Sequence, residues 1–120
     1  MVRVELLYFE GCPNWQRTLA TVERLIEELA VEAQLVTVRV EDAEDAERRR
    51  FLGSPSGQVE GRDVEPGADE RGEFVFACRI YRSDGELSGE PDQRWLREAL
   101  LAGTSSERET TTSTREKDAP

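Results

Sequence analysis

Hydrophobic and polar positions along the first forty residues follow two periods, and each period predicts one kind of element. Residues 2–9 alternate and then run apolar, which predicts a strand buried on both faces. An amphipathic helix of about 15–18 residues is predicted next, since apolar side chains recur there every three or four positions. Its apolar residues are Leu19, Val22, Leu25, Ile26 and Leu29, opposite Arg17, Glu23, Arg24, Glu27 and Glu28. Residues 35–40 are rich in β-branched residues, which predicts a second strand.

The later pattern predicts a helix, two strands and a last helix. Asp42 is a candidate N-cap for a second helix that runs to about Phe51. The Gly53-Ser54-Pro55 segment ends it, and residues 56–60 make a poor strand because only Val59 there has real strand preference. Residues 61–63 form a turn and 63–72 a loop, residues 74–81 give the strongest late strand, and 83–85 turn the chain. Pro91 opens a last helix that carries Trp95, Leu96, Leu100 and Leu101.

This order of elements predicts the α/β class. Strand, helix, strand, helix, two strands and a helix (βαβαββα) form a three-layer sandwich around a mixed sheet of about four strands. The first two strands are parallel and joined by a right-handed crossover, beside an antiparallel pair. Residues 1–103 then form one domain. Residues 104–120 have no apolar residue before Ala119, so we expect a disordered polar tail.

Composition excludes several classes of function. The formal net charge of −10 argues against nucleic acid or an anionic membrane as a partner. A histidine count of 0 removes Ser-His-Asp and Cys-His nucleophile pairs and every zinc site that needs a histidine. The two cysteines, Cys12 and Cys78, cannot complete a four-thiolate zinc site within one chain. We therefore expect no metal site and no cofactor.

Two features at the level of the whole chain indicate a cytoplasmic protein. No apolar run approaches the length of a membrane span. Glu5 and Glu10 interrupt and close the first apolar run, and no small-residue cleavage site follows, so we expect no secretory signal. Two distant cysteines without such a signal are typical of a reducing compartment.

Cys12 is the leading candidate for chemistry. It follows the first predicted strand, and Pro13 is suited to the first position of the helix, so the thiol is expected in the first helical turn. Unpaired N–H groups and the helix dipole favour thiolate over thiol there, and thiolate is the form that attacks disulfides. The alternative is that Cys12 is a small buried hydrophobic residue.

The segments Phe9-Glu10-Gly11-Cys12-Pro13 and Gly53-Ser54-Pro55, a thiol after the first strand and a proline before the third, resemble the thioredoxin-like superfamily. The resemblance covers roughly residues 2–102 and extends to small bacterial thioredoxin-family proteins. It implies that Cys12 is the nucleophile, that Pro55 is cis and faces the thiol, and that the backbone of Ser54 pairs with a bound peptide or thiol. Thioredoxins have a second cysteine where this chain has Trp15.

Other residues keep two interpretations. Cys78 is expected to be a buried residue in the middle of a strand; as a resolving thiol it would need a Cα atom within about 7 Å of that of Cys12. Trp15 either packs against the fold or forms an apolar wall beside the thiol. Four acidic residues are expected to be solvated or capping: Glu5, Glu10, Asp42 and Asp45.

The resemblance, with Trp15 in place of a second cysteine, implies a monothiol oxidoreductase of the thioredoxin or glutaredoxin type. Cys12 attacks a disulfide and an external thiol resolves the product, with Pro13, Trp15, Ser54 and Pro55 binding the partner. That partner is a low-molecular-weight thiol or a protein disulfide. One alternative is a binding module without turnover, with its site around Trp15 and Pro55. Another is handling of a soft metal or an organomercurial by Cys12, with or without Cys78.

Overall fold

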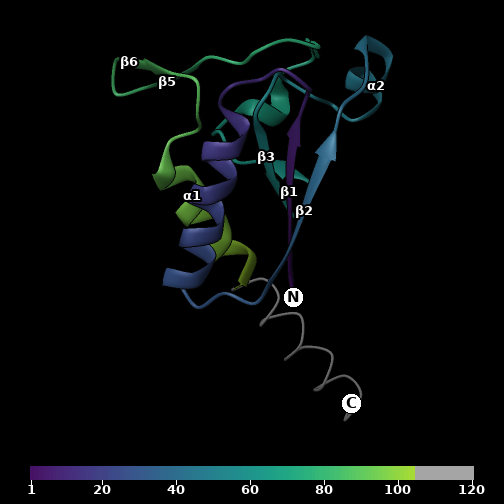
Figure 1. Cartoon of the computed structure of the whole chain (residues 1–120). Coiled ribbons are helices and arrows are strands. Elements are labelled where there is room, and N and C mark those ends of the chain that lie inside the picture. The colour runs from purple at the N-terminus through teal and green to yellow at the C-terminus, as the bar shows by residue number, and fades with distance from the viewer. Residues whose placement is uncertain (105–120) are drawn as a thin grey trace.

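The computed structural model describes residues 1–104, and its helices and strands are shown in Figure 1. In chain order the elements are β1 (Val2–Tyr8), α1 (Trp15–Glu28), β2 (Ala33–Arg39), α2 (Ala43–Arg48), β3 (Ser56–Val59), β4 (Arg62–Asp63), the 3-10 helix η1 (Ala68–Glu70), β5 (Tyr81–Ser83) and β6 (Glu86–Ser88). A last helix covers residues 93–104. The predicted polar tail, apart from Thr104 in this helix, lies outside the described residues.

Four strands form one mixed sheet in the order β2-β1-β3-β4. Strand β1 pairs in parallel with β2 and antiparallel with β3, so that Val4 lies between Leu35 and Val59. Strand β4 continues the sheet antiparallel to β3. The α/β class and the mixed sheet of about four strands are confirmed. Strands β5 and β6 form a separate hairpin around Asp84 and Gly85, which confirms the predicted turn.

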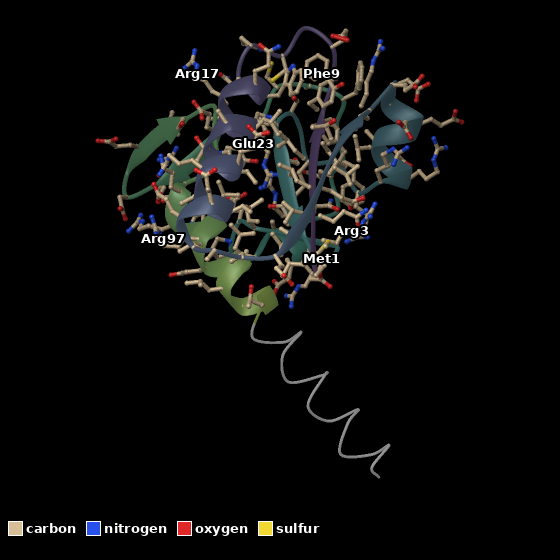
Figure 2. All side chains as sticks on the ribbon, turned by 60° about the horizontal axis from the view of Figure 1, so that its bottom comes forward. Met1, Arg3, Phe9, Arg17, Glu23 and Arg97 are labelled. Carbon is tan, nitrogen blue, oxygen red and sulfur yellow. The ribbon has the colours of Figure 1, made fainter. Side chains whose placement is uncertain are left out.

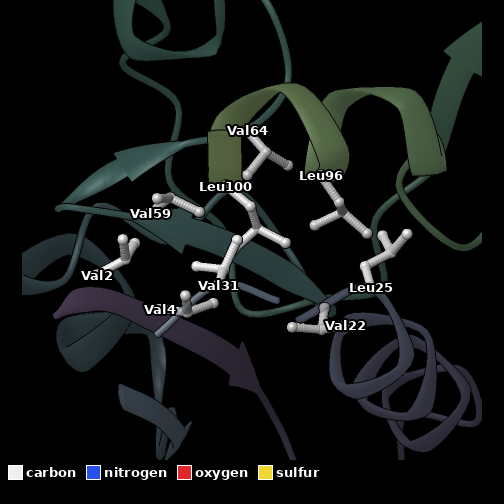
Figure 3. Packing of buried hydrophobic residues seen from close by; sticks show 9 residues of the cluster. All are labelled: Val2, Val4, Val22, Leu25, Val31, Val59, Val64, Leu96 and Leu100. Atoms are coloured by element: carbon white, nitrogen blue, oxygen red, sulfur yellow. The ribbon is translucent and has the colours of Figure 1, made fainter. Parts of the chain in front are cut away.

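Helices cover both faces of the sheet. Helix α1 and the helix of residues 93–104 pack side by side on one face, over a cluster formed by Val2, Val4, Val22, Leu25, Val31, Val59, Val64, Leu96 and Leu100 (Figure 3). Helix α2 covers part of the other face through a smaller cluster of Leu7, Val40, Ala46 and Phe51. Because side chains alternate along a strand, β1 supplies Val2 and Val4 to one cluster and Leu7 to the other.

Both long helices begin after the proline that was expected to open them. Helix α1 starts at Trp15, and its first backbone bond joins the Thr18 N–H to the carbonyl of Asn14. In the last helix, the Arg94 N–H donates to the carboxylate of Asp92, which therefore caps the helix. Pro13 and Pro91 each precede the cap residue, so the prediction that they occupy the first helical position was wrong.

Helix α2 confirms the predicted cap but not the predicted length. The side chain of Asp42 accepts a hydrogen bond from the Asp45 N–H at 2.8 Å. The helix ends at Arg48 because Arg50 adopts a left-handed conformation with φ of 56°, which turns the chain out of the helix. That turn brings Phe51 back into the smaller cluster, where its side chain is fully buried.

Of the two late strands predicted, the weaker one joins the sheet and the stronger one does not. Residues 56–59, expected to be a poor strand, form β3, which lies between β1 and β4 and is buried throughout. Gly57 lies beside the core, since a Cβ atom there would make an ordinary van der Waals contact with Leu96 at 3.5 Å. Residues 74–80, expected to be the strongest late strand, are outside the sheet, and only Tyr81 enters β5. Burial decided against strand preference in both segments.

Within residues 1–104, no helix combines the length and the apolar character needed to cross a bilayer.

Candidate functional site

Cys12 lies in a turn between β1 and α1. Its N–H donates to the carbonyl of Phe9 at 3.2 Å, and Gly11 closes the turn with a φ of +97° that favours glycine. Cys12 precedes the cap residue Asn14 by two positions, so the prediction that it lies in the first helical turn was wrong. Its side chain is nearly buried, with 6% of its surface exposed. The thiol is therefore at the carboxyl end of β1 and almost covered.

A hydrogen bond joins this turn to the segment before β3. The N–H of Phe9 donates to the Oγ of Ser54 at 3.3 Å. The peptide bond between Ser54 and Pro55 is cis, which confirms what the resemblance implied. In Figure 2, Phe9 lies at the same end of the molecule as Arg17 in the first turns of α1, and far from Met1. The fold thus brings Cys12's turn and Pro55's peptide to one end of the sheet.

The backbone of Ser54 is already paired with the chain itself. Its N–H donates to the carbonyl of Ala77 at 2.8 Å, and its carbonyl accepts from the N–H of Arg79 at 2.9 Å. A third bond joins the Val75 N–H to the Phe51 carbonyl at 3.0 Å. We call residues 75–79 the strap; in Figure 1 it belongs to the segment that crosses the upper end of the sheet before β5. Where the resemblance implied a bound peptide, the strap pairs with Ser54.

Cys78 lies in the strap and is exposed. It pairs with Ser54 in an isolated parallel β-bridge. The prediction of a buried residue in the middle of a strand was therefore wrong. The reason is that the strap lies outside the four-stranded sheet, and of residues 75–79 only Arg79 is buried.

Arg79 holds the strap down, and the sequence analysis missed it. Its side chain is 2% exposed and binds the Asp63 carboxylate through two hydrogen bonds of 2.7 and 3.0 Å. The same guanidinium donates to Ser56 Oγ at 2.7 Å and to Glu65 at 2.6 Å. It also lies over the ring of Tyr81, 4.3 Å from the ring centre. An arginine inside the apolar run of residues 74–81 was the available signal, since a buried charge needs built partners.

The surroundings keep Arg79 charged and its neighbour Tyr81 neutral. Burial disfavours the charged guanidinium, but hydrogen bonds to Asp63 and Glu65 outweigh it and raise the pKa of Arg79 above its ordinary value. Burial also raises the pKa of Tyr81, whose hydroxyl donates to the carbonyl of Pro55. Arg79 and Tyr81 thus fix both the strap and the cis peptide.

Aromatic rings surround the turn. Trp15 stacks on Tyr8 with ring centres 4.0 Å apart and planes 16° from parallel, so packing accounts for its position. Phe9 contacts Phe76 of the strap, with ring centres 5.0 Å apart. Pro13 is exposed beside the thiol.

The acidic residues have structural partners. Glu5 pairs with Arg3 at 3.1 Å, and Glu10 approaches Arg39 at 3.9 Å, both near the surface. Asp45 is buried and binds Arg48 and Arg49. In the described part of the chain no three His, Cys, Asp or Glu side chains gather as metal ligands would.

Comparison with protein-family models, with curated proteins and with solved structures finds no significant match. The class that the fold defines is an α/β protein with a four-stranded mixed sheet. What distinguishes its site is a nearly covered thiol after β1, a cis proline before β3, and a second thiol on the strap. Thiolate attack on sulfur is the chemistry that these groups can perform.

Proposed function

We propose that this protein is a thioredoxin-like thiol–disulfide oxidoreductase in which Cys12 is the attacking thiol. One observation carries the proposal: Cys12 follows β1, a cis Pro55 directly precedes β3, and the Phe9–Ser54 hydrogen bond joins their segments. The sheet order supports it, because β1 and β2 are parallel and the antiparallel pair of β3 and β4 lies beside them.

The reaction is thiol–disulfide exchange. The Cys12 thiolate attacks one sulfur of a disulfide, a bond forms between the two sulfurs, and the other half leaves as a thiolate that takes a proton from water. A second thiol then attacks the mixed disulfide and releases Cys12. No cysteine lies one helical turn after Cys12, since Trp15 occupies that position.

The site favours a low-molecular-weight disulfide over a protein disulfide. A peptide substrate would need the N–H and C=O groups of Ser54, and both are bonded to the strap. The sulfur of Cys12 is also nearly covered, which leaves little room for a folded partner. A small disulfide needs neither the free backbone nor a wide opening.

Exposure of the reduced protein to oxidised glutathione, followed by mass spectrometry of the digested chain, tests the proposal. We expect a glutathione adduct, or a disulfide derived from it, on Cys12. Cys12→Ser is the matched control and should abolish it. Reaction confined to the exposed Cys78, with none at Cys12, would contradict the proposal and leave the fold as a binding scaffold.

A further inference from the structure

We propose that Cys78 is the second thiol of this site and resolves the mixed disulfide on Cys12 within the same chain. The inference rests on the proposed function, because it needs Cys12 to form a mixed disulfide first. It replaces the external resolving thiol that the sequence alone predicts. This role requires the Cys78 side chain to point from the strap in the direction of Cys12.

Two contacts give that direction. Residues paired in a β-bridge point their side chains to the same side, so Cys78 shares a side with Ser54. The Oγ of Ser54 meets the N–H of Phe9, at the start of the turn that ends at Cys12. Alternation along the strap places Phe76 on that side too, and its ring contacts the ring of Phe9. This side of the strap therefore faces Cys12's turn.

The opposite side of the strap is fixed. Arg79, next to Cys78, is buried against Asp63, Ser56 and Glu65, so the strap cannot rotate without breaking that network. Gly53 permits the close approach: a Cβ atom there would lie 2.8 Å from the Cβ of Arg79. The anchor on one side thus sets the orientation of the thiol on the other.

The difference in exposure between the two thiols suits a two-step reaction. Cys12 is nearly covered, so a small disulfide reaches its sulfur more easily than a folded partner does. Cys78 is exposed, so water can stabilise its thiolate before it attacks. A tethered thiol acts at an effective concentration of roughly millimolar, without any encounter from solution.

Both steps are thiol–disulfide exchanges. The Cys12 thiolate attacks a low-molecular-weight disulfide, which forms the mixed disulfide and releases one small thiolate. The Cys78 thiolate then attacks the Cys12 sulfur, which forms the Cys12–Cys78 disulfide and releases the second small thiolate. Two cysteine thiols are oxidised by two electrons, the small disulfide is reduced to two thiols, and the two cysteine protons end on those leaving groups.

The test follows wild type and Cys78→Ser after mixing with oxidised glutathione, by intact mass and by peptide mapping. Wild type should lose two hydrogen atoms and yield a linked Cys12–Cys78 peptide. Cys78→Ser should stop at the glutathione adduct on Cys12, which should last at least about tenfold longer than in wild type because the tethered thiol is gone. Serine at this exposed position should leave the circular dichroism spectrum unchanged.

The outcomes separate the two proposals. Equal adduct lifetimes on Cys12 in both proteins, with no linked peptide, would overturn the role of Cys78 and leave the exchange reaction at Cys12 intact. Absence of any adduct or link at Cys12 in both proteins would overturn the proposed function itself, and this inference with it.

Discussion

The apolar face of the sheet under α1 and the strap at its end are held in place by different interactions. The face under α1 is packed by aliphatic side chains, of which Leu25 is fully buried. The strap is held by three backbone hydrogen bonds and by the guanidinium of Arg79 with its carboxylate partners. Burial of apolar area has no direction, whereas a bidentate ion pair fixes both distance and angle. The apolar face supplies cohesion, and the polar contacts of the strap supply the orientation that the proposed role of Cys78 needs.

Arg79→Met should cause the largest loss of stability. It leaves the buried carboxylate of Asp63 without its cation, and breaking a buried ion pair costs about 3–5 kcal/mol. Urea denaturation measures this loss, and amide exchange at Ser54 should accelerate as the strap loosens. Exposed Arg82→Met is the control and should change stability by less than about 0.5 kcal/mol. Adding Asp63→Asn to Arg79→Met should recover part of the loss; no recovery would contradict the ion-pair explanation.

Leu25→Ala tests the apolar face and should lower the free energy of unfolding by about 3 kcal/mol, since it leaves a cavity in the core. Leu101→Ala, at a half-exposed position of the last helix, serves as the control with a much smaller effect. In contrast to Arg79→Met, this change should accelerate amide exchange at Ser54 only as far as it increases global unfolding. Selective opening of the strap in Leu25→Ala would show that the strap and the apolar face are not independent.

Gly53→Ala should cost about 2–3 kcal/mol, because alanine is strained at a φ of +118° and its Cβ would collide with Arg79. Gly61→Ala isolates the backbone part: its φ is +81°, nothing lies within 4 Å of the added atom, and the cost should be roughly 1 kcal/mol. Chemical denaturation of both variants gives the difference. Equal losses would mean that the strap does not press against Gly53.

Tyr81→Phe should have the smallest effect, about 1 kcal/mol, from loss of the hydrogen bond to the Pro55 carbonyl. Burial raises the pKa of Tyr81, so the folded state disfavours its ionised form. The stabilisation is therefore complete below the unfolded pKa of about 10 and declines as pH rises above it. Urea denaturation across this range should show a shallower alkaline decline in Tyr81→Phe than in wild type. Parallel curves would remove Tyr81 from the network.

The first half of the fold could be predicted from sequence because its signals are local. The helical spacing of Val22 and Leu25 and the β-branched run of residues 35–40 each specify an element and its buried face. The prediction that Asp42 caps α2 was likewise correct. Each of these residues needs only neighbours within a few positions to adopt its structure.

The second half could not be predicted in this way because distant partners decide it. Gly57 has low strand preference, yet β1 and β4 on either side make its segment a central strand. Residues 74–80 have high strand preference, yet Arg79 finds its partners at Asp63 and Glu65 and holds the segment outside the sheet. Of the site, Cys12 came from its own local pattern, while the cis peptide at Pro55 came from the resemblance alone.

The strap also imposes an order of events during synthesis. The ribosome delivers Ser54 well before residues 75–79, so the N–H and C=O groups of Ser54 lack their partners until that later part of the chain has emerged. Closure of this end of the sheet is therefore tied to completion of the chain, and a product truncated before residue 75 would lose both backbone partners of Ser54.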